Sequence, residues 1–101
     1  MVADKNIIVW VARIEVTPID IDVSNMCGAF VNVVVLAVSI AEALSSICHA
    51  LEKMGFTSLY VQVIQDHRRV KRKYRHKEEL KRLVQYAKRT KHPQFGAFHS
   101  W

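Results

Sequence analysis

Apolar and polar residues follow a two-residue period over residues 7–16. One set of alternate positions is wholly apolar and consists of Ile8, Trp10, Ala12, Ile14 and Val16. A period of two is typical of a strand that turns one face to a core. We expect Thr17-Pro18 to end this strand, because proline has no amide hydrogen for the ladder and biases the preceding residue to extended geometry.

Residues 30–38 are apolar on both faces apart from Asn32, and most of them are β-branched. This pattern predicts an interior strand, and residues 59–64 predict a third one. The first two strands are joined by a loop, which favours antiparallel pairing. The second and third are joined through a helix, which predicts that they pair in parallel with a right-handed crossover.

The helix between these strands should begin at a capping box, Ser39-Ile40-Ala41-Glu42. The serine oxygen accepts from a first-turn amide, and the glutamate reaches back to the serine amide. Gly55 is placed to end the helix in the left-handed conformation. Its predicted apolar stripe consists of Ile40, Leu44, Ile47, Leu51 and Met54.

A second amphipathic helix is predicted by Leu80, Leu83, Val84 and Ala87, which are spaced at i, i+3, i+4 and i+7 and precede His92-Pro93. Residues 67–75 carry too many charges to be buried, so they should form an exposed edge strand or a loop. The predicted order is therefore strand, strand, helix, strand, helix.

This order favours the α+β class, with a small mixed sheet of three or four strands and both helices on one face. The topology resembles a ferredoxin-like split unit, an analogy of fold that implies no function. At 101 residues, half of them apolar, the chain fits one folded domain. We expect residues 1–101 to form that domain, with residues 66–101 as a basic helical segment packed on it.

Three features of the sequence bear on the compartment. Residues 1–6 lack the pattern of a secretory signal, and Cys27 and Cys48 are too few for a disulfide framework. Residues 23–41 are uncharged and almost long enough to cross a bilayer, but polar residues and Gly28 interrupt them, so a strand that runs into a helix explains them better. We therefore expect free thiols, a cytoplasmic location and no membrane partner.

Charge is divided unevenly along the chain. Residues 1–65 hold three basic and six acidic residues, whereas residues 66–101 hold twelve basic and three acidic ones. The net charge of +6 is thus the sum of −3 and +9. Such a local surplus selects an anionic partner.

Our first hypothesis is a small intracellular, non-catalytic interaction module whose basic C-terminal helix binds an acidic protein surface. The alternative is sequence-tolerant RNA or DNA binding through the same segment, with Tyr74 and Tyr86 as stacking surfaces. A solvated helix face is the simplest competing interpretation. The predicted binding residues are Arg68, Arg69, Lys71, Arg72, Lys73, Arg75, Lys77, Lys81, Arg82, Lys88 and Arg89.

Catalytic and cofactor signatures are weak. No histidine or cysteine pair has the spacing of a zinc site, and the glycines are isolated. Asp20 and Asp22 could present oxygens to a cation, face water, or meet the basic segment within one chain or across a dimer. Asp66-His67 lacks a nucleophile beside it. We predict no cofactor and no metal, and the balance favours a protein that is not an enzyme.

The chain ends in an aromatic tail with Phe95, Phe98 and Trp101. These residues could finish the core or form an interface, and core closure is favoured because large exposed apolar patches are rare on monomers. A small sheet also leaves free edges, through which a homodimer could pair.

Overall fold

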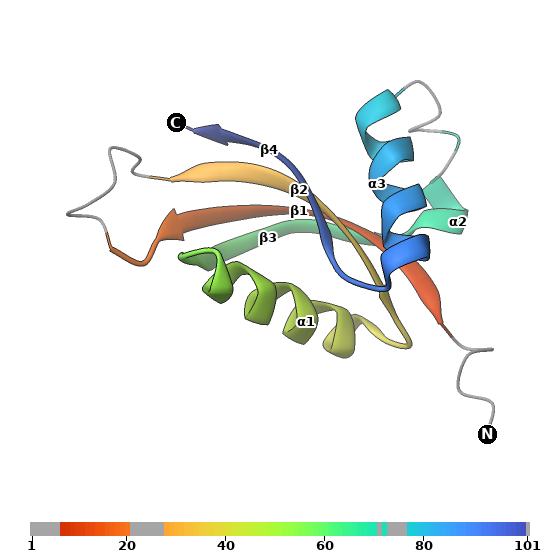
Figure 1. Cartoon of the computed structure of the whole chain (residues 1–101), viewed down its shortest axis with the longest axis horizontal. Coiled ribbons are helices and arrows are strands. Elements are labelled where there is room, and N and C mark those ends of the chain that lie inside the picture. The colour runs from red at the N-terminus through yellow and green to blue at the C-terminus, as the bar shows by residue number, and fades with distance from the viewer. Residues whose placement is uncertain (1–6, 21–27, 71, 73–76, 101) are drawn as a thin grey trace.

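The computed structural model describes residues 7–20, 28–70, 72 and 77–100 (Figure 1). The strands are β1 (Ile8–Pro18), β2 (Ala29–Ala37), β3 (Phe56–Asp66) and β4 (Gln94–Ser100). The helices are α1 (Ile40–Lys53), α2 (His67–Val70) and α3 (Glu78–Thr90). The predicted α+β class is confirmed.

The strands form one sheet in the order β3-β1-β2-β4, and each pair of neighbours is antiparallel. The antiparallel pairing of the first two strands is confirmed. The mixed sheet is wrong, because β1 lies between β2 and β3 and keeps them from pairing. The chain leaves β2, crosses over β1 through α1 and adds β3 to the outer edge of β1.

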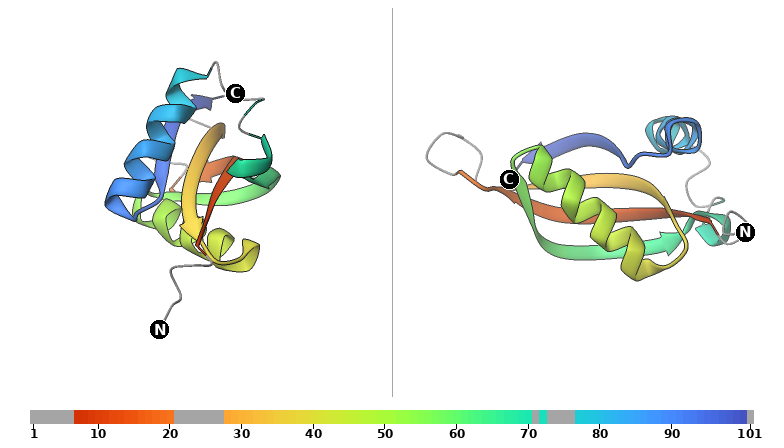
Figure 2. Two further views of the ribbon diagram at one scale, coloured as in Figure 1. Left: turned by 90° about the vertical axis from the view of Figure 1, so that its right-hand side faces the viewer. Right: turned by 60° about the horizontal axis from the view of Figure 1, so that its bottom comes forward.

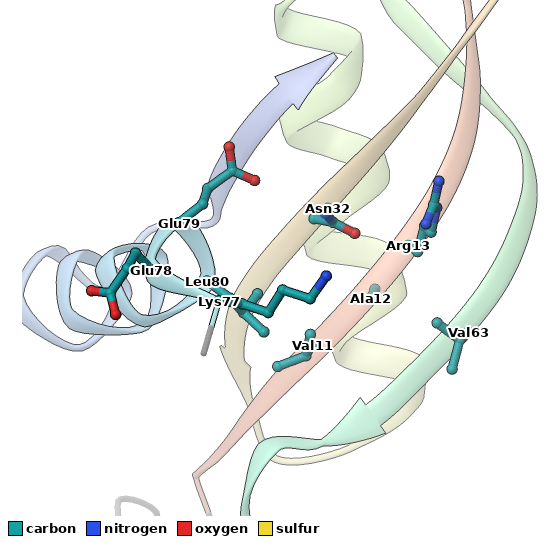
Figure 3. Close-up of a pocket in the computed structure, with 9 residues that line it drawn as sticks. All are labelled: Val11, Ala12, Arg13, Asn32, Val63, Lys77, Glu78, Glu79 and Leu80. Atoms are coloured by element: carbon teal, nitrogen blue, oxygen red, sulfur yellow. The ribbon is translucent and has the colours of Figure 1, made fainter. Parts of the chain in front are cut away.

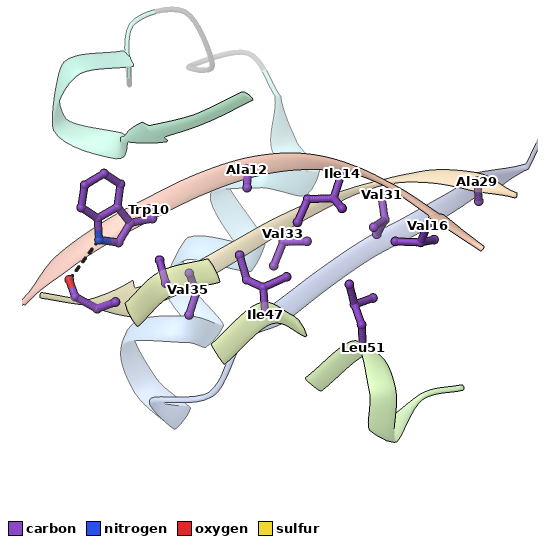
Figure 4. Packing of buried hydrophobic residues seen from close by; sticks show 12 residues of the cluster. Trp10, Ala12, Ile14, Val16, Ala29, Val31, Val33, Val35, Ile47 and Leu51 are labelled. Atoms are coloured by element: carbon purple, nitrogen blue, oxygen red, sulfur yellow. Dashed lines mark hydrogen bonds between the residues drawn. The ribbon is translucent and has the colours of Figure 1, made fainter. Parts of the chain in front are cut away.

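The helices lie on opposite faces of the sheet, which corrects the expectation of both on one face (Figure 2). α1 contributes Ala43, Ile47 and Leu51 to the larger apolar cluster (Figure 4). The strand residues of that cluster are Trp10, Ala12, Ile14, Val16, Ala29, Val31, Val33, Val35 and Ala37. On the other face, α3 packs on Val11 and Val34. The physical reason is that β2 is apolar on both sides, so each side needs a cover. A ferredoxin-like arrangement, with its helices on one face, is not supported by this placement.

α1 begins and ends as its sequence indicates. Ser39 Oγ accepts from the amide of Glu42 at 3.1 Å, and the glutamate carboxylate accepts from the amide of Val38 at 3.3 Å rather than from that of Ser39. Gly55 has a φ of +88°, which is the left-handed stop. The predicted stripe is wrong at both ends, because Ile40 and Met54 are exposed and Ala43 is buried.

The aromatic tail forms the fourth strand, which the predicted order lacked. β4 pairs with β2, and the register shifts between Val31 and Val33. Phe98 pairs with Val31 and Phe95 with Val33, so one extra residue bulges and lets both rings pack on the α1 cluster. Phe98 stacks on Phe56 with 4.8 Å between ring centroids. Core closure by these two residues is confirmed, whereas Trp101 lies outside the described residues.

The basic stretch after β3 starts as the short helix α2, so its described part is not an edge strand. The uncharged stretch 23–41 is β2 and the start of α1 over its described part, residues 28–41. Within the described ranges, each helix is too short or too polar to traverse a lipid bilayer.

Candidate binding surface

α3 is held on the sheet by the residues that its sequence pattern indicates. Leu80, Leu83, Val84 and Ala87 are all buried against Val11 and Val34. The helix ends at Lys91, whose φ of 64° is left-handed and whose amide donates to Ala87 O at 2.9 Å. Because four points along one stripe are anchored, the opposite side of the helix is held toward solvent.

That solvent side carries two rows of cations. Arg82 and Arg89 form one row and Lys81 and Lys88 the other, and all four side chains are exposed. The members of each row are seven residues apart, which is about 10.5 Å along a helix axis. We call these four residues the α3 basic face.

Among the described residues, acidic side chains neutralise little of this face. Lys81 Nζ lies 3.4 Å from Glu78 Oε1, in a solvent-exposed pair that contributes little binding energy. A glutamate on a helix can pair with a cation at i+3 or i+4, and the described partner of Glu78 is Lys81 rather than Arg82. Among the residues that the structure describes, Arg82, Lys88 and Arg89 take part in no salt bridge. The positive potential of the face therefore persists.

Tyr86 adds an aromatic surface beside the cations. Its side chain is 41% exposed, and the guanidinium carbon of Arg89 lies 4.9 Å from the centre of its ring. A cation over a ring face is attracted by the ring quadrupole. This contact positions the Arg89 guanidinium without cancelling its charge.

The cations that precede α3 in the chain form a second group, of which Arg68 and Arg69 belong to α2. α2 packs beside β1 and β3, whereas α3 packs on β2 and β4 (Figure 2). Arg69 and Arg72 are exposed, and Lys77 caps the start of α3 with no side-chain hydrogen bond. Three further predicted binding residues lie outside the described residues: Lys71, Lys73 and Arg75.

Arg68 differs from the other cations because Asp66 holds it. Arg68 Nη2 lies 2.8 Å from Asp66 Oδ2, and the backbone amide of Arg68 donates to the same carboxylate at 2.9 Å. The guanidinium hydrogen bond lowers the pKa of the Asp66 carboxyl and raises the pKa of Arg68. Sequence reasoning assigned Arg68 to a partner, but its charge is already matched within the chain.

A hollow of about 380 Å³ lies between the start of α3 and the sheet (Figure 3). Lys77 extends over the sheet in this view, whereas Glu78 points away and Glu79 points toward β4. Glu79 accepts from the amide of Ala97 at 3.4 Å, so its charge is directed to the strand. The lining residues are Val11, Ala12, Arg13, Asn32, Val63, Lys77, Glu78, Glu79 and Leu80. The lining carries two cations, Arg13 and Lys77, and two acids, Glu78 and Glu79, so the hollow is a mixed site that no local sequence pattern indicated.

The remaining residues that the sequence offered as metal ligands or nucleophiles do not come together in one site. Asp20 is exposed, and Asp22 and Cys27 lie outside the described residues. Cys48 Sγ lies 3.6 Å from Ser58 Oγ, next to the core. Over the described ranges, no three His, Cys, Asp or Glu side chains gather in a way that could hold a metal ion.

Comparisons of the chain with protein-family models, with curated proteins and with solved structures find no match. Function is therefore argued from the surface itself.

Proposed function

We propose that this chain is a non-catalytic binding module that uses the α3 basic face to hold an acidic surface of another protein. The observation that carries the proposal is the pair of cation rows, Lys81/Lys88 and Arg82/Arg89, on a helix anchored by its opposite side. An anchored helix loses little backbone freedom when it binds, so the electrostatic attraction is offset only by the ordering of the side chains.

The spacing of the rows supports a helical partner. Acidic residues seven apart on a second helix repeat at the same interval, about 10.5 Å, as the cations of α3. Two adjacent acids repeated in this way would face both rows at once. Tyr86 lies beside the rows and supplies an aromatic contact of the kind that is enriched in interfaces.

The test is a fluorescence anisotropy titration with a synthetic helical peptide that carries adjacent glutamates every seven residues. A peptide with the same composition and scrambled glutamate spacing is the control ligand. We expect Arg82→Gln with Arg89→Gln to raise the Kd about two- to thirtyfold, since exposed charge pairs contribute about 0.2–1 kcal/mol each and 1.4 kcal/mol is tenfold.

Arg13→Gln with Lys53→Gln is the matched control, because it removes the same two charges elsewhere on the protein. Equal weakening by both double variants would mean that only net charge matters. Equal binding of the two peptides would contradict the spacing argument.

The second candidate is sequence-tolerant binding of single-stranded nucleic acid, and the Tyr86–Arg89 contact is the observation that favours it. Bases stack on exposed aromatic rings, and the cations would meet phosphates. A labelled single-stranded RNA titrated at several salt concentrations tests it, because the slope of affinity with salt counts the neutralised phosphates. RNA binding that depends on Tyr86, with no binding of the acidic peptide, would replace the first proposal.

A further inference from the structure

β3 borders the sheet on the side opposite β4 (Figure 2). It is 11 residues long and pairs only through its inner side, with β1, among the described strands. Its outer side therefore presents backbone amides and carbonyls that no described strand pairs. Such a row is a template for another strand.

The composition of β3 leaves this edge unprotected. Residues 56–65 contain no charged residue and no proline, and Asp66 at the end is bound by Arg68. Natural proteins protect free edges with lysine, proline or short strands. β4 follows that rule, because it has seven residues and comes directly after Pro93. The register shifts of β3 against β1 bend the strand but put no charge on it.

Exposed apolar side chains gather along the same edge. Among the described residues, the four most exposed large apolar side chains are Met54, Leu59, Tyr60 and Ile19, at 46–60% exposure. Leu59 and Tyr60 are in β3. Met54 immediately precedes Gly55, and the Ile19 amide donates to Gly55 O at 2.9 Å, so both lie where β3 begins. Apolar surface that follows one edge marks an interaction site.

We infer that the outer edge of β3 pairs with β3 of a second copy of this chain, in antiparallel orientation, so that the two sheets become one. Twofold symmetry through a single edge requires the antiparallel orientation, since the same surface must meet itself. Because residues 56–65 are uncharged, β3 can pair with its copy without like-charge repulsion. A charged edge would bring like charges together across the twofold axis.

The antiparallel orientation also determines which charges meet at the ends of the strand. The end of one β3 lies beside the start of the other, where α1 of that copy ends. The exposed Arg69 after one β3 therefore approaches the last turn of the other α1, where the backbone carbonyls and the exposed Glu52 attract a cation and the exposed Lys53 repels it. The α3 basic face lies over β2 and β4 and stays free, so this inference is independent of the proposed function.

Sedimentation equilibrium of the full chain, from micromolar to millimolar concentration, tests the inference. We expect a monomer–dimer equilibrium whose Kd rises roughly tenfold or more in Leu59→Lys with Tyr60→Lys, because lysine on a free edge disfavours strand pairing and the new charge at position 60 lies diagonally across the twofold axis from its copy. The matched control is Ile7→Lys with Tyr86→Lys, two side chains that are each 41% exposed and lie away from β3. It adds the same charge and should leave the dimer in place.

Amide hydrogen exchange of the unmodified protein is the second measurement, and it does not depend on how the variants fold. Exchange in β3 should slow as protein concentration rises, while exchange in β4 stays constant. A protein that remains monomeric at millimolar concentration overturns the inference. So does a dimer that survives the β3 variant, or concentration-dependent protection in β4 alone.

Discussion

Two isoleucines of α1 provide a direct test of how this helix packs. Ile40 and Ile47 are seven residues apart and so share a rotational face of the helix, yet Ile40 is 45% exposed and Ile47 is 0% exposed. The difference arises along the axis, because the first turn of α1 lies beyond Ala37, where β2 has ended. Replacing each by alanine deletes the same atoms from two environments.

Ile47→Ala should lower the free energy of unfolding by about 3 kcal/mol, because it leaves a cavity among fully packed side chains. This loss is a large part of the roughly 5–15 kcal/mol by which a folded domain is stable. In a domain of this size each kcal/mol shifts the thermal midpoint by about 4–8 °C, so the thermal midpoint should fall by roughly 12–24 °C. Ile40→Ala should cost about 0.5 kcal/mol or less, since half of its surface is already in water and alanine favours the helix.

Urea unfolding followed by far-UV circular dichroism measures both variants, at one low protein concentration so that association does not contribute. The urea concentration at the midpoint of unfolding should fall for Ile47→Ala, whereas the m-value should stay unchanged. If Ile40→Ala destabilises the protein as much as Ile47→Ala, the described placement of α1 on the sheet is refuted, and the stripe inferred from spacing alone is restored.

Three further substitutions test single contacts. Trp10→Phe removes the indole N–H that donates to Ala37 O at 3.0 Å and should cost about 1 kcal/mol in urea unfolding; no loss would mean that water replaces the bond. Gly55→Ala should cost about 1–2 kcal/mol in the same assay because of its φ of +88°, with no steric contact to add to the cost; a neutral result would contradict the left-handed stop. Asp66→Asn should remove a small pH-dependent contribution. Because the Arg68 hydrogen bond lowers the folded pKa of Asp66, its stabilisation is present above the unfolded pKa of about 3.9 and lost as pH falls through the folded value; thermal melting of both proteins should differ near neutral pH and converge in acid.

Local patterns predicted the elements well because each depends on neighbours in sequence. The buried stripe of α3 was correct at every position, since i, i+3, i+4 spacing defines a helix face wherever the helix lies. The same holds for Trp10 and its alternate positions in β1. The exposure of Arg82 and Arg89 follows from that stripe, so this part of the candidate surface was predictable.

Long-range arrangement was not predictable in the same way. No local signal indicates that β3 joins the far side of β1, because the pairing depends on how α1 packs across the sheet. Phe95 and Phe98 are three apart, a spacing that does not suggest a strand until a bulge brings both rings to one face. The choice of Lys81 over Arg82 as the partner of Glu78 depends on rotamers that spacing cannot decide.

The two proposed surfaces lie on different parts of the sheet, and this has a measurable consequence. α3 packs on β2 and β4, whereas β3 forms the opposite border (Figure 1). Pairing through β3 would therefore place two α3 basic faces on one particle. A short acidic peptide occupies one face at a time, so its affinity should be the same for the unmodified protein and for the β3 variant with Leu59→Lys and Tyr60→Lys. A bead densely coated with the same peptide can engage both faces, and linked binding of this kind raises apparent affinity without a new contact. If the β3 variant loses this gain in apparent affinity, pairing through β3 is what brings two α3 basic faces together. If both proteins gain equally, each α3 basic face binds alone.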